Sequence, residues 1–289
     1  MTVVSLFDGI SCGRVAFDRA GIPVEAYYAY EIDPYAVQIS QRNYPSIVHC
    51  GDVRAADFRR YRFFDALIGG SPCQSLSITR ADIRDNLNGK SRLFFEFYRA
   101  KQEMEPTWFL FENVESMNEE SKEIISELLG CAPLLIDSKD FSAQQRLRYY
   151  WTNIPVDLST LPHNTMVLGD ILQPADQIDD QLWYHEPVYN IDLSQQVCAT
   201  LDININQMHK RVFNPAFKCH TLTCVSGGNQ QKKVLQDGRP RKLTPLEYER
   251  LQTLPDDYTA CVSNARRYTA IGNGWTVDVI AWILSQIPT

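Results

Sequence analysis

The first 155 residues alternate short apolar runs with longer amphipathic ones, and this alternation constrains the fold more than any other feature. Apolar or aromatic runs predict strands at residues 3–7, 26–30, 47–49, 64–68, 108–111, 133–136 and 149–152. Between the first runs, Gly21 closes one predicted helix and Pro34 opens the next. Strands that alternate with helices of about a dozen residues form a doubly wound sheet. We therefore predict an α/β fold with a mostly parallel, Rossmann-like sheet.

This rhythm stops after Pro155. Residues 156–240 are rich in Pro, Asn, Gln and Asp, with short β-prone stretches at 196–201 and 220–225. A smaller, irregular second domain is predicted for 156–240.

Helical patterning returns after that segment. Thr244, Pro245 and Glu247 have the residue types of an N-cap, a first and a third helical position, and an apolar helix is predicted over 276–286. The large domain is therefore predicted to comprise residues 1–155 and 241–289.

The net charge of −7 hides a strong local asymmetry. Residues 156–195 contain no Lys or Arg, whereas residues 206–242 contain eight of them and a single acid, Asp237. A local basic stretch is what phosphate contact requires, although an ordinary solvated surface has the same composition. Charge alone leaves both interpretations open.

Cysteine usage and hydropathy indicate the compartment. None of the eight cysteines forms a Cys-x-x-Cys pair and the five histidines do not cluster beside them, so we predict no metal site. Residues 1–6 lack the features of a signal peptide, and no apolar run is long enough to cross a bilayer. We expect a cytoplasmic protein that does not bind membranes, in which most cysteines are plain buried thiols.

Three predicted strands end in residues suited to a nucleoside. Phe7-Asp8-Gly9-Ile10-Ser11-Cys12-Gly13 follows the first strand, and its glycines let the main chain approach a ligand. Glu31 ends the second strand, where an acid can bind ribose hydroxyls, and Asp52 follows the third. A nicotinamide enzyme would use the same architecture, but its Gly-x-Gly-x-x-Gly is absent. S-adenosylmethionine fits better, while ordinary strand–helix turns remain the alternative.

A candidate nucleophile follows the fourth predicted strand. Gly69-Gly70-Ser71-Pro72-Cys73-Gln74 places Cys73 on a turn shaped by Gly and Pro, and Glu112 ends the next strand. Adjacent parallel strands bring their carboxyl ends together, which predicts Glu112 near Cys73. A thiolate, a carboxylic acid and a methyl donor suit methylation of cytosine at carbon 5, with the thiolate adding to carbon 6 and the acid at N3. Taken alone, Cys73 is better explained as a buried strand-end thiol, and it is Glu112 and the arginines at matching strand ends that favour catalysis.

Two further segments fit that chemistry. Gln144-Gln145-Arg146-Leu147-Arg148 offers two arginines for the base carbonyl and a phosphate. A base inside a duplex must be flipped out to be reached, and the polar stretch 74–90 is predicted to close over it.

In this order, Phe-Asp-Gly-x-x-x-Gly, Gly-Asp-Val, Gly-Gly-Ser-Pro-Cys-Gln, Phe-Glu-Asn-Val, Gln-x-Arg-x-Arg and a late Gly-Asn-Gly-Trp resemble the DNA (cytosine-5) methyltransferases. The resemblance covers residues 3–155 and 241–283. Residues 69–73 and 92–99 look most like the vertebrate de novo branch, whereas the small size looks like a bacterial or phage enzyme.

The resemblance implies roles for individual residues. Cys73 would be the nucleophile, Glu112 the N3 partner, and Arg146 and Arg148 the support for base and phosphate. S-adenosylmethionine, which becomes S-adenosylhomocysteine, would be held by Phe7, Asp8, Gly9, Ser11, Cys12, Gly13, Glu31, Ile32, Asp52, Val53, Gly70, Pro72, Leu93, Asn273 and Trp275.

The resemblance also implies double-stranded DNA as the partner. Residues 156–240 would be the target-recognition domain, with 226–233 as a flexible loop of base-reading amides and phosphate-binding lysines; a disordered surface loop is the alternative. The DNA-contacting residues would be Gln74, Ser77, Asn229, Lys232 and Lys233. The segment from Phe94 to Tyr98 matches a helix through which the vertebrate branch self-associates.

Two rival functions remain. A tRNA cytosine methyltransferase resembles this chain in fold and thiol, but carries Pro-Pro-Cys-Gln where Ser71-Pro72-Cys73-Gln74 stands here. A short basic loop with amides also suits a DNA groove better than a folded RNA. A catalytically silent regulatory relative would lack the nucleophile, whereas Cys73, Glu112 and both arginines are present.

Overall fold

The computed structural model describes residues 1–72, 92–225 and 228–288, and the chain divides into two compact units. Unit 1 comprises Met1–Asp137, Leu147–Ser159 and Val279–Thr289, and unit 2 comprises Ser138–Arg146 and Thr160–Asp278. By packing, residues 241–278 therefore belong with unit 2, although the sequence grouped them with the large domain. The assignment of a function to each domain stays a prediction.

Unit 1 is built on a seven-stranded sheet in the order β3-β2-β1-β4-β5-β8-β6. Its strands are β1 (Thr2–Leu6), β2 (Ala26–Tyr30), β3 (Val48–His49), β4 (Ala66–Gly69), β5 (Trp108–Val114), β6 (Leu134–Asp137) and β8 (Leu147–Thr152). The pairs from β3 through β5 are parallel, and β8 runs antiparallel to both of its neighbours. This confirms the doubly wound, mostly parallel sheet.

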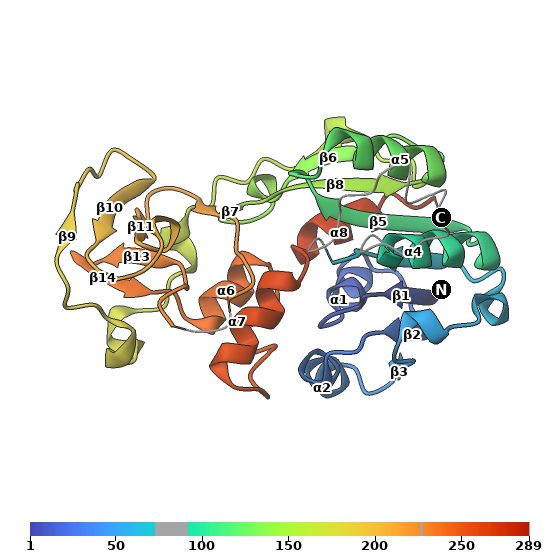
Figure 1. Cartoon of the computed structure of the whole chain (residues 1–289), viewed down its shortest axis with the longest axis horizontal. Coiled ribbons are helices and arrows are strands. Elements are labelled where there is room, and N and C mark those ends of the chain that lie inside the picture. The colour runs from blue at the N-terminus through green and yellow to red at the C-terminus, as the bar shows by residue number, and fades with distance from the viewer. Residues whose placement is uncertain (73–91, 226–227, 289) are drawn as a thin grey trace. The chain divides into compact units, whose positions relative to one another are not determined.

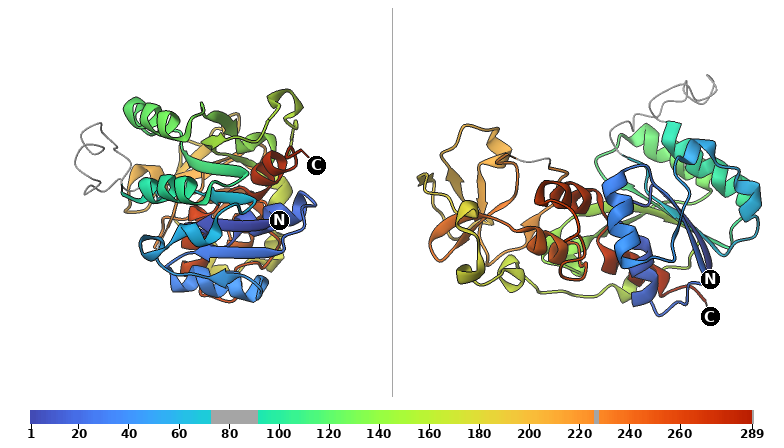
Figure 2. Two further views of the ribbon diagram at one scale, coloured as in Figure 1. Left: turned by 90° about the vertical axis from the view of Figure 1, so that its right-hand side faces the viewer. Right: turned by 90° about the horizontal axis from the view of Figure 1, so that it is seen from below.

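Helices cover both faces of this sheet (Figures 1 and 2). They are α1 (Cys12–Arg19), α2 (Pro34–Asn43), α4 (Arg92–Met104) and α5 (Glu119–Leu129). Helices α4 and α5 cover one face, and α1 and α2 cover the other (Figure 2). Asp33 caps α2 by accepting a hydrogen bond from the Tyr35 amide, and Pro34 stands at its first position as predicted.

The aromatic residues of α4 are part of the core of unit 1. Phe94 and Phe97 both pack on Phe111 of β5, with ring centroids 5.3 and 4.8 Å apart. Phe94, Phe95 and Phe97 are buried in the same cluster as Trp151. Self-association through residues 94–98 stays a prediction, and these three rings are already used inside the unit.

Strand register brings four carboxyl ends into one line. Tyr30 of β2 pairs with Leu6 of β1, Leu6 with Gly69 of β4, and Gly69 with Phe111 of β5. Gly69 is needed there, because a Cβ would lie 2.8 Å from the Leu6 carbonyl oxygen. The residues that follow these four positions therefore share one edge of the sheet.

Unit 2 holds a five-stranded sheet in the order β14-β13-β11-β10-β9 and a short β12–β7 pair. The strands are β7 (Gln144–Gln145), β9 (Val188–Tyr189), β10 (Val197–Leu201), β11 (Arg211–Phe213), β12 (Cys219–His220), β13 (Lys233–Gln236) and β14 (Arg239–Lys242). Its helices are α6 (Pro245–Leu251) and α7 (Asn264–Asn273), and α8 (Val277–Leu284) begins in this unit. The strand predicted at 196–201 is confirmed, whereas the one predicted at 220–225 is wrong beyond His220.

A buried ion pair ties β14 to α6. The Arg241 guanidinium donates to both carboxylate oxygens of Glu247, at 2.8 and 2.6 Å, and both side chains are fully buried. Glu247 also completes the predicted capping box with Thr244. Because each remaining carboxylate contact is filled by a main-chain amide, from Gln173 and Thr244, the buried charge is fully satisfied.

Neither a membrane-spanning helix nor a metal cluster occurs in residues 1–72, 92–225 and 228–288. No helix there is long and apolar enough to cross a bilayer. No group of three or more His, Cys, Asp or Glu residues in that part of the chain is arranged to hold a metal ion.

Candidate functional site

The loop after β1 has an unusual main-chain conformation. Phe7, Gly9 and Ser11 have φ angles of 56°, 58° and 61°, and two of these three are not glycine. Left-handed backbone at non-glycine residues stores strain, and such residues cluster where ligands bind. The Ser11 hydroxyl is buried and bonds both Asp8 and Ser40 on α2, which holds the loop in this shape.

Glu31 closes this loop from the end of β2. Its Oε2 accepts from the Gly9 amide at 2.9 Å, and its Oε1 accepts from the Ile32 and Asp33 amides at 2.7 and 2.8 Å. Beside it, Ile32 is 69% exposed, and no large apolar residue in the described part of the chain is more exposed. An exposed aliphatic side chain next to an ordered carboxylate is a surface that an aromatic base can cover.

Asp8 is a half-buried carboxylate in the same loop. Burial raises its pKa to about 6, against the opposing effect of hydrogen bonds from Ser11 and Tyr27. The Tyr27 hydroxyl donates to Asp8 Oδ1 at 2.7 Å. Asp8 therefore braces the loop through its side chain rather than facing solvent freely.

The predicted adenine contacts follow β3. Asp52 caps a 3-10 helix (Val53–Ala55), and the Arg54 side chain pairs with its carboxylate and holds the Asp52 pKa below its ordinary value. Val53 is buried. In this structure the Asp52 carboxylate is thus bound to Arg54, and its adenine contact stays a prediction.

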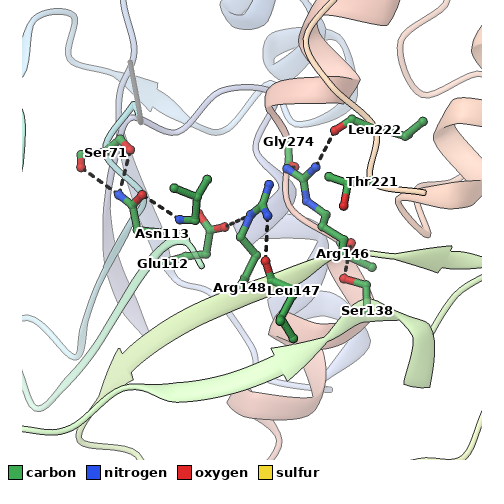
Figure 3. Close-up of polar contacts among 12 residues, drawn as sticks. Ser71, Glu112, Asn113, Ser138, Arg146, Leu147, Arg148, Thr221, Leu222 and Gly274 are labelled. Carbon is green, nitrogen blue, oxygen red and sulfur yellow. Dashed lines mark hydrogen bonds and ion pairs between the residues drawn. The ribbon is translucent and has the colours of Figure 1, made fainter. Parts of the chain in front are cut away.

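The ends of β4 and β5 are joined by a buried amide. Asn113 is 2% exposed, and its Nδ2 donates to the main-chain oxygen of Ser71 at 3.1 Å and to Ser71 Oγ at 3.2 Å (Figure 3). Its Oδ1 accepts from the Val114 amide at 2.7 Å. Asn113 therefore holds the segment that leads directly into Pro72 and Cys73.

Glu112 and Arg148 form an ion pair at the same edge. Arg148 Nε lies 3.0 Å from Glu112 Oε1, and the two side chains are 13% and 12% exposed (Figure 3). Arg148 stands on β8, whose antiparallel pairing places it opposite Val114. A second guanidinium nitrogen donates to the Leu147 carbonyl, so the arginine that pairs with this mostly buried carboxylate is held in place.

Arg146 has a different environment, inside unit 2. Its guanidinium donates to the main-chain oxygens of Leu222, Gly272 and Gly274, at 2.9, 3.3 and 3.1 Å (Figure 3). The residue is 5% exposed. The sequence predicted a base or phosphate contact, whereas these contacts fasten the end of α7 to the segment after β12.

The loop 228–231 precedes β13 and differs from its prediction. The flexible loop was expected to extend to residue 233, but β13 begins at Lys233, which is fully buried. Lys233 Nζ donates to the main-chain oxygens of Asn229 and Gln231 at 2.6 and 2.9 Å, and burial lowers its pKa to about 7. In this structure the donors of Lys233 are directed at main-chain oxygens, and its phosphate contact stays a prediction.

Its neighbours are also partly engaged. Lys232 is half-buried over the Phe213 ring at 5.4 Å, and burial lowers its pKa. The Asn229 side-chain oxygen accepts from the Tyr184 hydroxyl at 2.9 Å. Their DNA contacts stay predictions.

The remaining predicted residues fall into three groups. Cys12 and Gly13 are buried in the first turn of α1, while Gly70, Pro72 and Leu93 lie at or beside the end of β4 and the start of α4. Asn273 and Trp275 lie at the end of α7 in unit 2. Cys73, Gln74 and Ser77 lie outside the described residues.

Asn113 and Lys233 are two of the side chains whose positioning contacts the sequence did not reveal. Asn113 follows Glu112 directly, so its place at the strand end was visible, but its bond to Ser71 depends on which face of β5 it occupies. Lys233 has the residue type of a phosphate ligand, and only the folded structure shows that it is buried and donates to main-chain oxygens of the loop.

A doubly wound sheet with a ligand loop after β1 and polar residues at its carboxyl edge is the fold of the class I methyltransferases. A family model described as C-5 cytosine-specific DNA methylase matches residues 1–289. The chain belongs to this family, whose members are DNA methyltransferases.

Curated relatives include bacterial type II methyltransferases. The type II methyltransferase M.NlaX of Neisseria lactamica is 30% identical over 310 residues, covering 99% of this chain and 95% of the relative. The type II methyltransferase M.HhaI of Haemophilus parahaemolyticus is 25% identical, covering 98% and 93%.

Solved structures share the fold. The Entamoeba histolytica methyltransferase EhMeth superimposes with a TM-score of 0.75 at 14% identity, covering 99% of this chain and 97% of that one. The S. pombe Dnmt2 methyltransferase gives 0.71 at 16% identity, with the same coverage.

Proposed function

We propose that the protein transfers a methyl group from S-adenosylmethionine to carbon 5 of a flipped-out cytosine in double-stranded DNA, with Cys73 as the covalent nucleophile. The observation that carries this proposal is the Glu112–Arg148 pair at 3.0 Å, at the sheet edge where β4 leads toward Cys73. The family membership and the type II names of its relatives support DNA as the substrate.

Glu112 acts at N3 of the cytosine. As the Cys73 thiolate adds to carbon 6, the ring gains electron density, and a carboxyl group at N3 stabilises it by sharing a proton. Carbon 5 then becomes nucleophilic enough to take a methyl group. Loss of the carbon 5 proton to a base afterwards expels the thiolate and restores the aromatic ring.

Arg148 orients Glu112 and binds the oxygen on carbon 2 of the base. One nitrogen of its guanidinium is already fixed on Glu112 and another on the Leu147 carbonyl, and a guanidinium carries further donors in the same plane. Within unit 2, Arg146 holds main-chain carbonyls of Leu222 and Gly274, and its contact with the base or a phosphate stays a prediction.

The residues at the ends of β1 and β2 fit the cosubstrate. The exposed Ile32 suits an adenine, and the ordered Glu31 suits a ribose. The strained loop at residues 7–11 suits a close approach of the main chain to the cosubstrate. When bound, S-adenosylmethionine supplies the methyl group as a sulfonium and leaves as S-adenosylhomocysteine. The other residues that would contact it are those assigned by the resemblance above.

Within the family, the residues at 69–73 and 92–99 favour kinship with the de novo vertebrate branch, in a protein of bacterial or phage type. A companion restriction enzyme is consistent with the type II names of the relatives.

The test is trapping with DNA that carries 5-fluorocytosine, since fluorine at carbon 5 blocks release of the thiolate. Wild-type protein with S-adenosylmethionine is expected to give a covalent protein–DNA band, and Cys73→Ser none. Cys131→Ser serves as the matched control and should still be trapped. A band that persists in Cys73→Ser contradicts the mechanism, and trapping of tRNA instead of DNA contradicts the substrate. No band in wild type favours a silent regulatory relative.

A further inference from the structure

A continuous row of hydrogen bonds joins the loop after β1 to α2 and β3 inside unit 1. Ser11 Oγ lies 2.5 Å from Asp8 Oδ2 and 2.6 Å from Ser40 Oγ on α2. Ser40 Oγ lies in turn 3.3 Å from Nε2 of His49, the last residue of β3. Both serines are fully buried, so this row, which we call the Asp8–His49 network, runs through the interior of the unit.

The charge on Asp8 fixes the direction of every bond in this network. A carboxylate can only accept, so the Ser11 hydroxyl donates its proton to Asp8 and accepts from the Ser40 hydroxyl. Ser40 has then given its proton to Ser11 and must accept from Nε2–H of His49. Each donor in such a row polarises the next, so the donors add up at the carboxylate.

The second nitrogen of His49 supports this direction. Its Nδ1 is buried and has no hydrogen-bond partner within residues 1–72, 92–225 and 228–288. A protonated ring would carry an N–H at this position and bury it without an acceptor, which costs free energy. Burial lowers the pKa of His49, against the opposing effect of the Glu31 carboxylate. The ring is therefore neutral near pH 7, with its one proton placed on the nitrogen that faces Ser40.

The donors around Asp8 act against its burial. Burial raises the pKa of Asp8 to about 6, and the carboxylate of Glu31 at the end of β2 raises it further. Hydrogen bonds from Ser11, Ser5 and Tyr27 lower it, the last from the Tyr27 hydroxyl to Oδ1 at 2.7 Å. Because the two effects nearly balance close to neutral pH, the loss of one donor changes how much of Asp8 is ionised.

A charge at this position distinguishes the cosubstrate from its product. Asp8 lies between Phe7 and Gly9, in the strained loop proposed to approach the cosubstrate. S-adenosylmethionine carries a positive charge on its sulfur, whereas the sulfur of S-adenosylhomocysteine is neutral. Attraction between opposite charges inside a protein extends beyond contact distance, so a carboxylate in this loop favours the charged ligand.

We propose that Ser40 and His49 are positioning residues of the cosubstrate loop, and that they act by keeping Asp8 as a carboxylate. The carboxylate selects S-adenosylmethionine over S-adenosylhomocysteine, which lets the product leave once the methyl group has been transferred. This inference rests on the proposed function, because it names how that enzyme distinguishes its two ligands.

The experiment measures the Kd of S-adenosylmethionine and of S-adenosylhomocysteine by calorimetry from pH 5 to 8. In wild type, the preference for S-adenosylmethionine is expected to rise about tenfold as Asp8 ionises, and in Asp8→Asn it should stay level. In Ser40→Ala and His49→Leu the same rise should move to higher pH, further for Ser40→Ala, because Asp8 loses donor strength. Ser40→Thr keeps the hydroxyl and should restore the wild-type curve. Ser46→Ala, an exposed serine just before β3, is the control and should leave the curve unchanged.

The outcomes separate this inference from the proposed function. If wild type binds both ligands with a preference that does not depend on pH, the role of the network is overturned and the methyltransferase stands. Equal losses of affinity for both ligands in Ser40→Ala, with the rise at its wild-type pH, also overturn it, since a merely structural role gives that result. A rise that persists in Asp8→Asn assigns the effect to another group and overturns it as well. If Ser40→Ala fails to fold, the half-buried His49 decides the question. A wild-type protein that binds neither ligand overturns the proposed function and this inference together.

Discussion

The strand ends of unit 1 and the loop 228–231 of unit 2 both carry polar groups, but these groups are fixed in different ways. In unit 1, sheet register places Glu31, Ser71 and Glu112 at one edge, and short contacts such as Asn113 to Ser71 refine it. In unit 2, the loop is fixed by side chains, chiefly Lys233 and His209. The register of the sheet is set by the whole fold. The contacts of Lys233 and His209 with the loop, which we call the loop latch, can be removed by a single substitution. The first arrangement suits chemistry that stays constant, and the second suits a target sequence that varies.

If this comparison holds, changes in unit 1 alter rate and changes in unit 2 alter choice of site. The largest effect is expected for Glu112→Gln, which keeps the shape of the side chain but removes the carboxyl group. The rate of methyl transfer in a single turnover should fall by about 10² to 10⁴-fold, with an unchanged preference for the bases that flank the cytosine. Glu115→Gln, three residues further and exposed, is the control. A Glu112→Gln enzyme as fast as wild type would exclude the role at N3.

The buried ion pair in unit 2 gives the next largest effect. Arg241→Met leaves Glu247 as an uncompensated buried charge and should lower the free energy of unfolding by about 3–5 kcal/mol in urea titrations. The double variant Arg241→Met/Glu247→Leu should recover much of this loss. Arg62→Met, which breaks an exposed pair with Glu105 in unit 1, should cost less than about 1 kcal/mol.

The Arg241→Met variant also tests whether the loop latch depends on β14. Arg241 stands on β14 opposite Val234, one residue from Lys233 on β13. Loosening this strand pair should blur the preference for flanking bases, read by bisulfite sequencing of methylated random duplexes, in the molecules that stay folded. A sharp preference in folded Arg241→Met protein would show that the loop is held independently of β14.

A smaller effect is expected from Asn113→Leu. Ser71 would lose two donors from a buried amide, at a cost of about 1–3 kcal/mol, and the turn before Cys73 would be less well placed. The single-turnover rate should fall about tenfold while the affinity for S-adenosylhomocysteine changes little. Asn153→Leu is a matched control, because Asn153 bridges Phe109 and Thr107 at the opposite end of β5. Equal losses of rate in both variants would reduce Asn113 to a structural role.

The sequence predicted the sheet and most of its strand-end residues because their positions follow from local pattern. An apolar run followed by Gly, Glu or Asp fixes where a strand ends, and parallel order then brings those ends together. It did not predict Arg146 on three carbonyls or Lys233 inside unit 2, because a cation in sequence gives no sign of whether its donors face solvent or main chain. The Arg241–Glu247 pair was hidden for the same reason. Only tertiary packing decides between these alternatives.

The smallest expected effect is on the pH dependence of stability, which should have opposite signs for Asp8 in unit 1 and Lys233 in unit 2. The pKa of Asp8 is raised to about 6, so the folded state binds its proton more tightly than the unfolded chain does. This contribution to stability is complete below about pH 4 and is lost as the pH rises through 6. The pKa of Lys233 is lowered to about 7, so its contribution is complete only above about pH 10 and is lost as the pH falls through 7.

Unfolding free energies of wild type, Asp8→Asn and Lys233→Met, measured from pH 4 to 10, separate the two slopes. Relative to Asp8→Asn, wild type should lose on the order of 1 kcal/mol between pH 4 and 7 and then stay level. Relative to Lys233→Met, it should gain stability between pH 7 and 10. Asp57→Asn is the control: Arg59 holds the Asp57 pKa below its ordinary value, so its difference from wild type should be flat above pH 5. If the Lys233 slope were absent, the amine would be solvated rather than bound to the loop. The loop would then lack its latch, and the contrast with the register-fixed edge of unit 1 would lose its basis.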